Sequence, residues 1–157
     1  MKRGRRPVML AIMMVLVGMV FVLPAAPALA ATCSGFQCDG KNPHTTSCDA
    51  NADTFETVYI RNAAGTAIGT VEYRWSLICL TSWSRVTSWI GAQTLTESIE
   101  RDDPSTPGHT TIYEKTYSDT DYGATQAFSP MVYYLEGLRT RACGGIGSYG
   151  KCTSWWN

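Results

Sequence analysis

The sequence predicts an all-β protein, a small disulfide-stapled barrel or sandwich of six to eight short strands that follows a cleaved signal peptide. Short runs in which polar and apolar side chains alternate recur along the chain, and turn-forming residues separate them. No segment after the leader has the apolar spacing of a long helix, and the chain contains no internal repeat. All six cysteines also lie after the leader, which is typical of a small exported domain.

The first thirty residues predict an export signal. Residues 1–6 carry four basic side chains, residues 8–23 form an apolar run, and residues 28–30 are a small-x-small cleavage site. The apolar run is shorter than the roughly 20 residues that span a membrane, and Pro24 follows it. We therefore expect cleavage and secretion, by the Sec route in preference to twin-arginine export, with an uncleaved anchor as the alternative.

Cleavage after Ala30 leaves 127 residues, enough for one domain with its own core. We divide them into a cysteine-rich N-terminal loop over 31–53 and an all-β domain over 54–157, so that 31–157 form one structural unit. This part holds nine Lys and Arg against thirteen Asp and Glu, a net charge of −4. Such a balance is unsuited to nucleic acid, and we expect no nucleic-acid partner and no stable membrane insertion after cleavage.

The even number of cysteines predicts three disulfides, with a structural role for Cys33, Cys38, Cys48, Cys79, Cys143 and Cys152. We expect Cys143 to pair with Cys152 across a glycine-rich loop, and Cys79 to pair with one of the three N-terminal cysteines. A zinc cluster at those three is the alternative, but the histidine or cysteine pair that would complete it is absent. We therefore predict no metal and no cofactor.

The first half of the domain reads as a hairpin followed by a further strand. Alternation over 54–61 and 67–75 predicts two strands joined by a turn at 62–65. The densest run of strand-forming and aromatic residues is 69–86, and it organises the rest of the chain. Its continuation over 80–90 predicts another strand, with a short helix as the alternative.

The second half alternates short elements with turns. We expect, in order, a strand or short helix over 92–101, an exposed turn over 102–109, a strand over 110–117, a flexible polar stretch over 118–124, an edge or bulged strand over 126–135, a strand over 138–143 and a glycine loop over 144–150.

Alternation also predicts which side chains are buried. The expected core aromatic and apolar residues are Phe55, Val71, Tyr73, Trp75 and Trp83. On the opposite face, Glu72 is expected to form a cross-strand ion pair with Arg74 or with Arg85, which fixes strand register.

Several motifs together resemble a known family. They are CSGFQCDGKNP from Cys33 with the later Cys48, VEYRWS over 71–76 with Cys79 and WSRV over 83–86, SPMV over 129–132, and ACG over 142–144. Over nearly all of the mature chain they resemble the secreted bacterial proteins grouped as domain of unknown function 2690 (YjfA-like). The resemblance implies a secreted, cysteine-stabilised domain and supplies no activity.

The sequence gives only weak signals for a catalytic site, and we assign no catalytic residue. The two histidines, His44 and His109, lie in turn-rich loops, and no nucleophile-elbow motif accompanies them. A carbohydrate-active enzyme would need two carboxyl groups in one cleft. The candidates on predicted strands are Glu72, Glu97, Glu100 and Glu114.

Surplus aromatic residues near loops and the chain end predict a ligand surface. We name Tyr133, Tyr149, Trp155 and Trp156 as ligand-binding residues, although the two tryptophans could instead cap the core. The predicted function is a secreted, disulfide-stabilised binding or interaction module, whose partner is a cell-wall glycan or another extracellular protein. The alternatives are a carbohydrate-active enzyme, and a secreted inhibitor or antagonistic toxin that works through the bridged loop 144–151.

Overall fold

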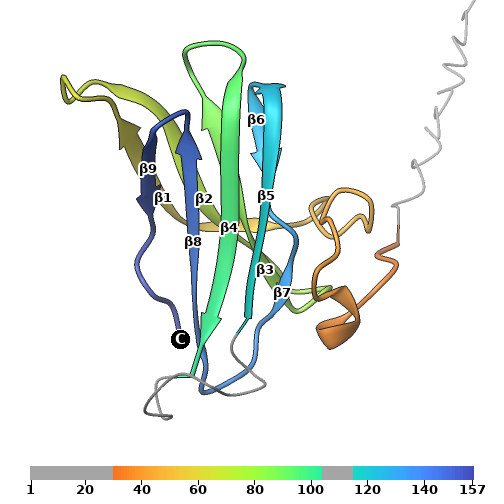
Figure 1. The fold of residues 1–157 in the computed structure, drawn as a ribbon. Coiled ribbons are helices and arrows are strands. Elements are labelled where there is room, and N and C mark those ends of the chain that lie inside the picture. The colour runs from red at the N-terminus through yellow and green to blue at the C-terminus, as the bar shows by residue number, and fades with distance from the viewer. Residues whose placement is uncertain (1–29, 104–114) are drawn as a thin grey trace, which may run out of the picture.

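Two antiparallel sheets face each other in the computed structural model, which describes residues 30–103 and 115–157 (Figure 1). The strands of the first sheet are β1 (Asp53–Arg61), β2 (Ala67–Ser76), β3 (Thr81–Ser88), β6 (Gln126–Phe128) and β7 (Val132–Tyr133). The second consists of β4 (Gln93–Asp102), β5 (Lys115–Ala124), β8 (Arg139–Ile146) and β9 (Tyr149–Cys152). The fold is all-β as predicted, and of the two expected architectures it is the sandwich. The described residues form nine strands, where six to eight were expected.

The first sheet has the order β1-β2-β3-β6, and β7 also pairs with β3. The predicted hairpin of β1 and β2 forms, closed by the backbone hydrogen bond from Asn62 to Thr66. Both segments with a helical alternative, 80–90 and 92–101, are strands. Burial alternates along 93–101, whereas most of 81–88 is buried on both faces, and in both segments strand partners on both sides satisfy the backbone.

Four expectations for the second half were wrong. The polar stretch 118–124 is part of β5, because β4 pairs with it along its length. The single strand expected over 126–135 is two short strands, since Pro130 between them cannot donate to the ladder. The glycine loop 144–150 is the hairpin of β8 and β9, and the turn expected to be exposed begins with two buried residues, Asp102 and Asp103.

The rest of that turn, 104–109, lies outside the described residues, as do 110–114 of the strand expected over 110–117. Among the described residues, no helix is long and apolar enough to cross a membrane.

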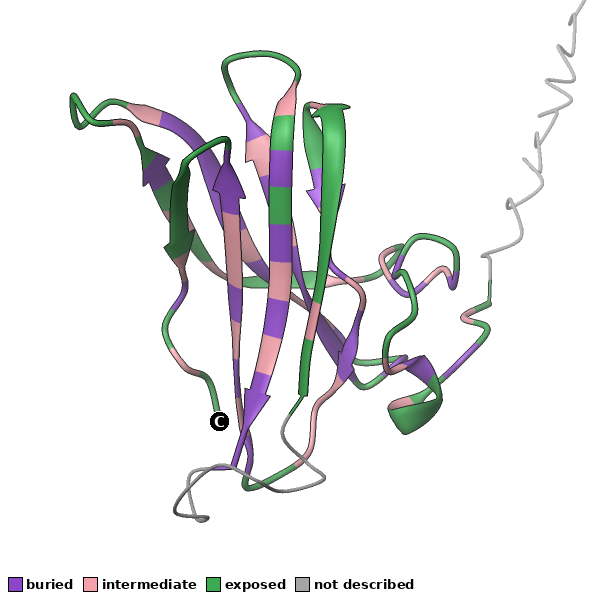
Figure 2. Cartoon of the chain, viewed as in Figure 1, coloured by how far each residue is buried: buried purple, intermediate pink, exposed green. Residues whose placement is uncertain are grey.

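The main core lies between the sheets. Burial alternates along β4, as the colour bands in Figure 2 show, and its inward side chains include Leu95 and Ile99. The buried members of this core are Ile60, Ile68, Val71, Tyr73, Val86, Leu95, Ile99, Ala127, Val132, Ala142 and Ile146. The sheets approach so closely at Gly144 that a Cβ there would lie 2.2 Å from Cγ2 of Val86.

A second, smaller core lies on the outer side of the first sheet, under the N-terminal lobe, which we define as residues 31–52. Trp83 pairs with Arg74 across the strands, so it points away from Val71 and Tyr73 and is fully buried against this lobe. The lobe contains the 3-10 helix η1 (Gly35–Cys38). Trp83 is therefore a core residue as predicted, but of a different core.

The disulfides confirm the expected pattern. Cys48 bonds to Cys79 and so ties the N-terminal lobe to the turn between β2 and β3, and Cys33 bonds to Cys38 within the lobe. Cys143 bonds to Cys152 across β8 and β9. Phe55 was wrongly expected in the core: it is 49% exposed, because β1 is an edge strand with a bulge between Thr54 and Glu56.

Candidate functional site

The outer face of the second sheet carries rows of unusually small side chains. Leu95 and Ile99 point into the core, so strand alternation turns Thr96 and Ser98 outward. Strand register then aligns two rows across all four strands. One row is Thr120, Thr96, Gly145 and Gly150, and the next is Ser118, Ser98, Cys143 and Cys152.

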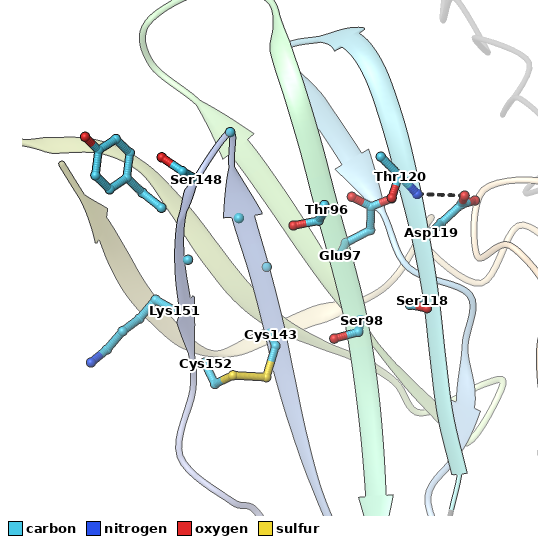
Figure 3. Close-up of a pocket in the computed structure, with 15 residues that line it drawn as sticks. Thr96, Glu97, Ser98, Ser118, Asp119, Thr120, Cys143, Ser148, Lys151 and Cys152 are labelled. Carbon is cyan, nitrogen blue, oxygen red and sulfur yellow. Dashed lines mark hydrogen bonds between the residues drawn. A yellow bond between two sulfur atoms is a disulfide. The ribbon is translucent and has the colours of Figure 1, made fainter.

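These rows form the floor of an open groove of about 1060 Å³ (Figure 3). Hydroxyl groups of β4 and β5 line one half of it, and glycine backbone and the Cys143–Cys152 disulfide line the other half. Lys151 and Ser148 lie at its β9 side. Among the described residues no bulky side chain stands on the floor, so an extended ligand can lie directly against the strands.

Beyond these rows the same face becomes charged. Glu100 pairs with Arg141 at 2.7 Å and Asp102 with Arg139 at 2.6 Å, each pair directly opposite in the strand register. The ring of Trp155 lies against both guanidinium groups, with centroid distances of 4.8 Å to Arg139 and 4.4 Å to Arg141. These cation–π contacts hold the indole in place on the outer face.

A buried acid lies beneath the groove. Glu97 is 1% exposed, and its side chain points from β4 towards β5, away from Thr96 and Ser98 (Figure 3). Within the described part of the chain, neither carboxyl oxygen accepts a hydrogen bond. Burial, together with the negative charges of Asp121 and Asp119, raises the pKa of Glu97 to about 8. Glu97 is therefore a neutral acid at neutral pH, able to donate a hydrogen bond to Asp121.

The four predicted ligand-binding aromatics do not lie on one surface. Thr140 points inward and pairs with Trp156, so alternation places Trp156 on the core side and Trp155 on the outer face. Tyr149 lines the groove, but it pairs with the buried Ile146, so its ring projects away from the hydroxyl rows.

Tyr133 lies elsewhere, with its ring packed against that of Phe36 in the N-terminal lobe at 4.4 Å between centroids. Of the four residues, only Trp155 has its ring on the grooved face, while Tyr149 borders the groove with its ring turned to the other side. Whether any of them binds a ligand stays a prediction.

The predicted ion pair forms between Glu72 and Arg85, which are opposite each other on β2 and β3. Arg74 instead donates to the hydroxyl of Thr54 and to the carbonyl of Ala52, and it fastens the end of the N-terminal lobe to the sheet.

The three candidate catalytic carboxyl groups that the structure describes are not gathered in one cleft. Glu97 and Glu100 lie on opposite faces of β4, and Glu72 lies in the other sheet. Glu114 and His109 lie outside the described residues. His44 contacts Asp49 at 2.8 Å in an exposed turn.

The sulfur atoms of Cys33, Cys38 and Cys48 lie within 4.8 Å of one another, which is the cluster that prompted the zinc alternative. All three are in disulfides here, so they offer no thiolate to a metal. The loop 144–151, proposed as the working part of an inhibitor, is instead a paired hairpin that lines the groove.

Sequence reasoning missed the hydroxyl rows. The signal was present in β4, where Thr94, Thr96 and Ser98 alternate with Leu95 and the buried Glu97. That alternation predicts a half-buried strand, but by itself it does not predict a ligand-binding site. Only the pairing of β4 with β5 and β8 aligns these small residues with others of the same kind.

Comparison with known proteins gives a family but no activity. The family model for proteins of unknown function designated DUF2690 matches residues 36–143. The uncharacterized protein YjfA of Bacillus subtilis (strain 168) is 30% identical over 132 residues, which are 80% of this chain and 79% of that protein. No solved structure matches the chain.

Proposed function

The chain belongs to the DUF2690 family of proteins of unknown function, and from its outer sheet face we propose that it is an extracellular module that binds cell-envelope glycan. The observation that carries the proposal is the groove of small hydroxyl side chains and glycine backbone that crosses all four strands of the second sheet.

The chemistry of the groove suits a polar, uncharged polymer. Thr96, Ser98, Ser118 and Thr120 each present a hydroxyl that both donates and accepts hydrogen bonds, which matches the hydroxyl groups of a sugar chain. The flat floor, built partly from Gly145 and Gly150, lets a linear ligand approach the sheet without reorganising side chains.

Trp155 supplies an apolar ring at one end of this face. Its contacts with Arg139 and Arg141 fix the ring before any ligand arrives, so little side-chain entropy is lost when a sugar ring stacks on it. The two arginines are already paired with Glu100 and Asp102, so this end offers hydrogen bonds without a net charge.

The extracellular setting rests on two further features. The leader over residues 1–30 has the composition of an export signal. The six cysteines form three disulfides, which persist in oxidising compartments.

The test is cosedimentation of the exported protein with purified cell-wall material, followed by titration with soluble glycan fragments. Ser98→Tyr places a ring on the groove floor, and Trp155→Ala removes the stacking ring. Thr57→Tyr makes a matched change at an exposed position of the first sheet, away from the groove.

We expect Ser98→Tyr and Trp155→Ala each to weaken retention about tenfold or more, which is about 1.4 kcal/mol, while Thr57→Tyr binds like the wild type. Wild-type protein that stays in the supernatant with every envelope fraction would rule out the proposal. So would equal retention of all four proteins.

A further inference from the structure

A second hollow, separate from the groove, lies against the edge of the first sheet, and its walls are almost entirely aromatic. It has a volume of about 190 Å³. Its aromatic walls come from β1, β2, the segment after β7 and the chain end, and they are Phe55, Tyr73, Trp75, Tyr134 and Trp156. We call this hollow the aromatic pocket. It is smaller than the 300 to 1,000 Å³ typical of sites for drug-sized ligands, so it suits one small group.

Phe55 meets the neighbouring rings edge to face. Phe55 is inclined 89° to Tyr73 and 85° to Trp75, with centroid distances of 6.1 and 5.6 Å. Trp156 stands 5.8 Å from Phe55 and stacks on Tyr73 at 6.4 Å. These rings bound the hollow, and the face of an aromatic ring carries partial negative charge.

Two of the aromatic residues that line the pocket, Tyr73 and Trp156, already use their polar groups in hydrogen bonds within the protein. The hydroxyl of Tyr73 is hydrogen-bonded to Ser82 and Thr140, and the indole N–H of Trp156 donates to Glu56 at 2.8 Å. These two rings therefore offer a ligand their π surface and not a hydrogen bond.

Charge near the aromatic pocket is negative. Glu56 accepts hydrogen bonds from Trp156 and from the backbone and side chain of Ser154, and it has no ion-pair partner among the described residues. Its carboxylate also makes the indole ring of Trp156 more electron-rich. No lysine or arginine is among the residues that line the pocket in the described part of the chain.

We propose that the aromatic pocket binds a small methylated ammonium cation. Methyl groups around a positive nitrogen fill an apolar space and are attracted by π faces, and a nearby carboxylate adds the matching charge. A neutral group of the same shape gains only the apolar contact, and an anion is repelled by Glu56 and by the ring faces. The same cation could arrive as a free solute or as a lipid headgroup.

The test titrates the exported protein with choline and with its uncharged isostere, in which a quaternary carbon replaces the nitrogen. Binding is followed by tryptophan fluorescence and by the NMR signal of the Trp156 indole N–H. Phe55→Ala removes a half-exposed wall and Glu56→Gln removes the charge while it keeps the hydrogen-bond acceptor. Trp89→Ala is the control, because this tryptophan is 53% exposed just after the end of β3 and is not among the residues that line the pocket.

We expect choline to bind at least about tenfold more tightly than the isostere, a ratio that Glu56→Gln reduces and Phe55→Ala abolishes together with binding. Trp89→Ala should bind like the wild type. Retention on phosphatidylcholine vesicles as well as binding of free choline would assign the cation to a lipid headgroup, and binding of free choline alone would assign it to a solute.

Three results would overturn the proposal. They are no saturable choline binding at millimolar concentration, equal affinity for choline and the isostere, and choline affinity unchanged by Phe55→Ala. None of these measurements involves glycan, so the aromatic pocket and the groove can fail independently.

Discussion

The buried carboxyl group of Glu97 makes the stability of this protein dependent on pH. In the folded chain, burial and the charges of Asp121 and Asp119 raise its pKa from 4.5 to about 8. The unfolded chain releases this proton near pH 4.5, whereas the folded chain keeps it. Between these values the folded state binds more protons, so the free energy of unfolding falls as pH rises.

The slope follows from the number of protons. One group that is protonated only in the folded state lowers the free energy of unfolding by about 1.4 kcal/mol for each pH unit. Across the whole window the contribution reaches up to about 5 kcal/mol, and it levels off above the folded-state pKa.

Glu97→Gln removes the titration and keeps the shape of the side chain. We expect urea unfolding, followed by tryptophan fluorescence from about pH 5 to about pH 8, to show the wild type losing stability relative to this variant as pH rises. The buried amide has its own cost, but that cost does not change with pH, so the slope is the measurement that matters.

Glu136→Gln is the control, because it makes the same substitution in an exposed turn without touching the sheet interior. It should follow the wild type. Parallel curves for the wild type and Glu97→Gln would show that Glu97 is ionised in the folded protein, and the reasoning would be refuted.

Two further predictions concern stability. Gly144→Ala should lower the free energy of unfolding by about 1 to 3 kcal/mol, because the new Cβ would lie 2.2 Å from Val86 of the other sheet. Ser148→Ala in the neighbouring exposed turn should stay within about 0.5 kcal/mol of the wild type, and a similar loss in both variants would contradict this account. Replacing Cys48 and Cys79 by serine opens a loop of 31 residues and should cost about 4 kcal/mol in urea denaturation. Removing the shorter bridge of the N-terminal lobe, whose cysteines are five residues apart, should cost about 2 kcal/mol, so the reverse order would contradict the chain-entropy argument.

Part of the candidate site was foreseeable. Trp155 was expected to be a contact residue, and it does lie on the grooved face against two arginines. Its neighbour Trp156 was expected to act with it. Trp156 pairs with the inward-facing Thr140, however, so its ring lies on the core side of the sheet while that of Trp155 lies on the outer face. The hydroxyl rows escaped notice because a single serine or threonine carries no signal until strand register sets several of them side by side.

The sequence by itself determined the strand character of the chain, its first hairpin and its crosslinks. Alternation in TFETVYIR and TVEYRW is a local property, and both segments are strands within a residue of the expected bounds. The cysteine spacing likewise anticipated the bond between Cys143 and Cys152 and the attachment of Cys79 to the N-terminal part.

Only the tertiary structure decided which face of each strand is buried, and against what. Trp83 belongs to the core under the N-terminal lobe, and Phe55 is half exposed on an edge strand. The stretch 118–124, polar enough to look flexible, is a strand because β4 supplies its hydrogen-bond partners. These outcomes depend on pairing between segments distant in the chain. The stability of a paired strand depends on the side chains and backbone of its partner as much as on its own residues.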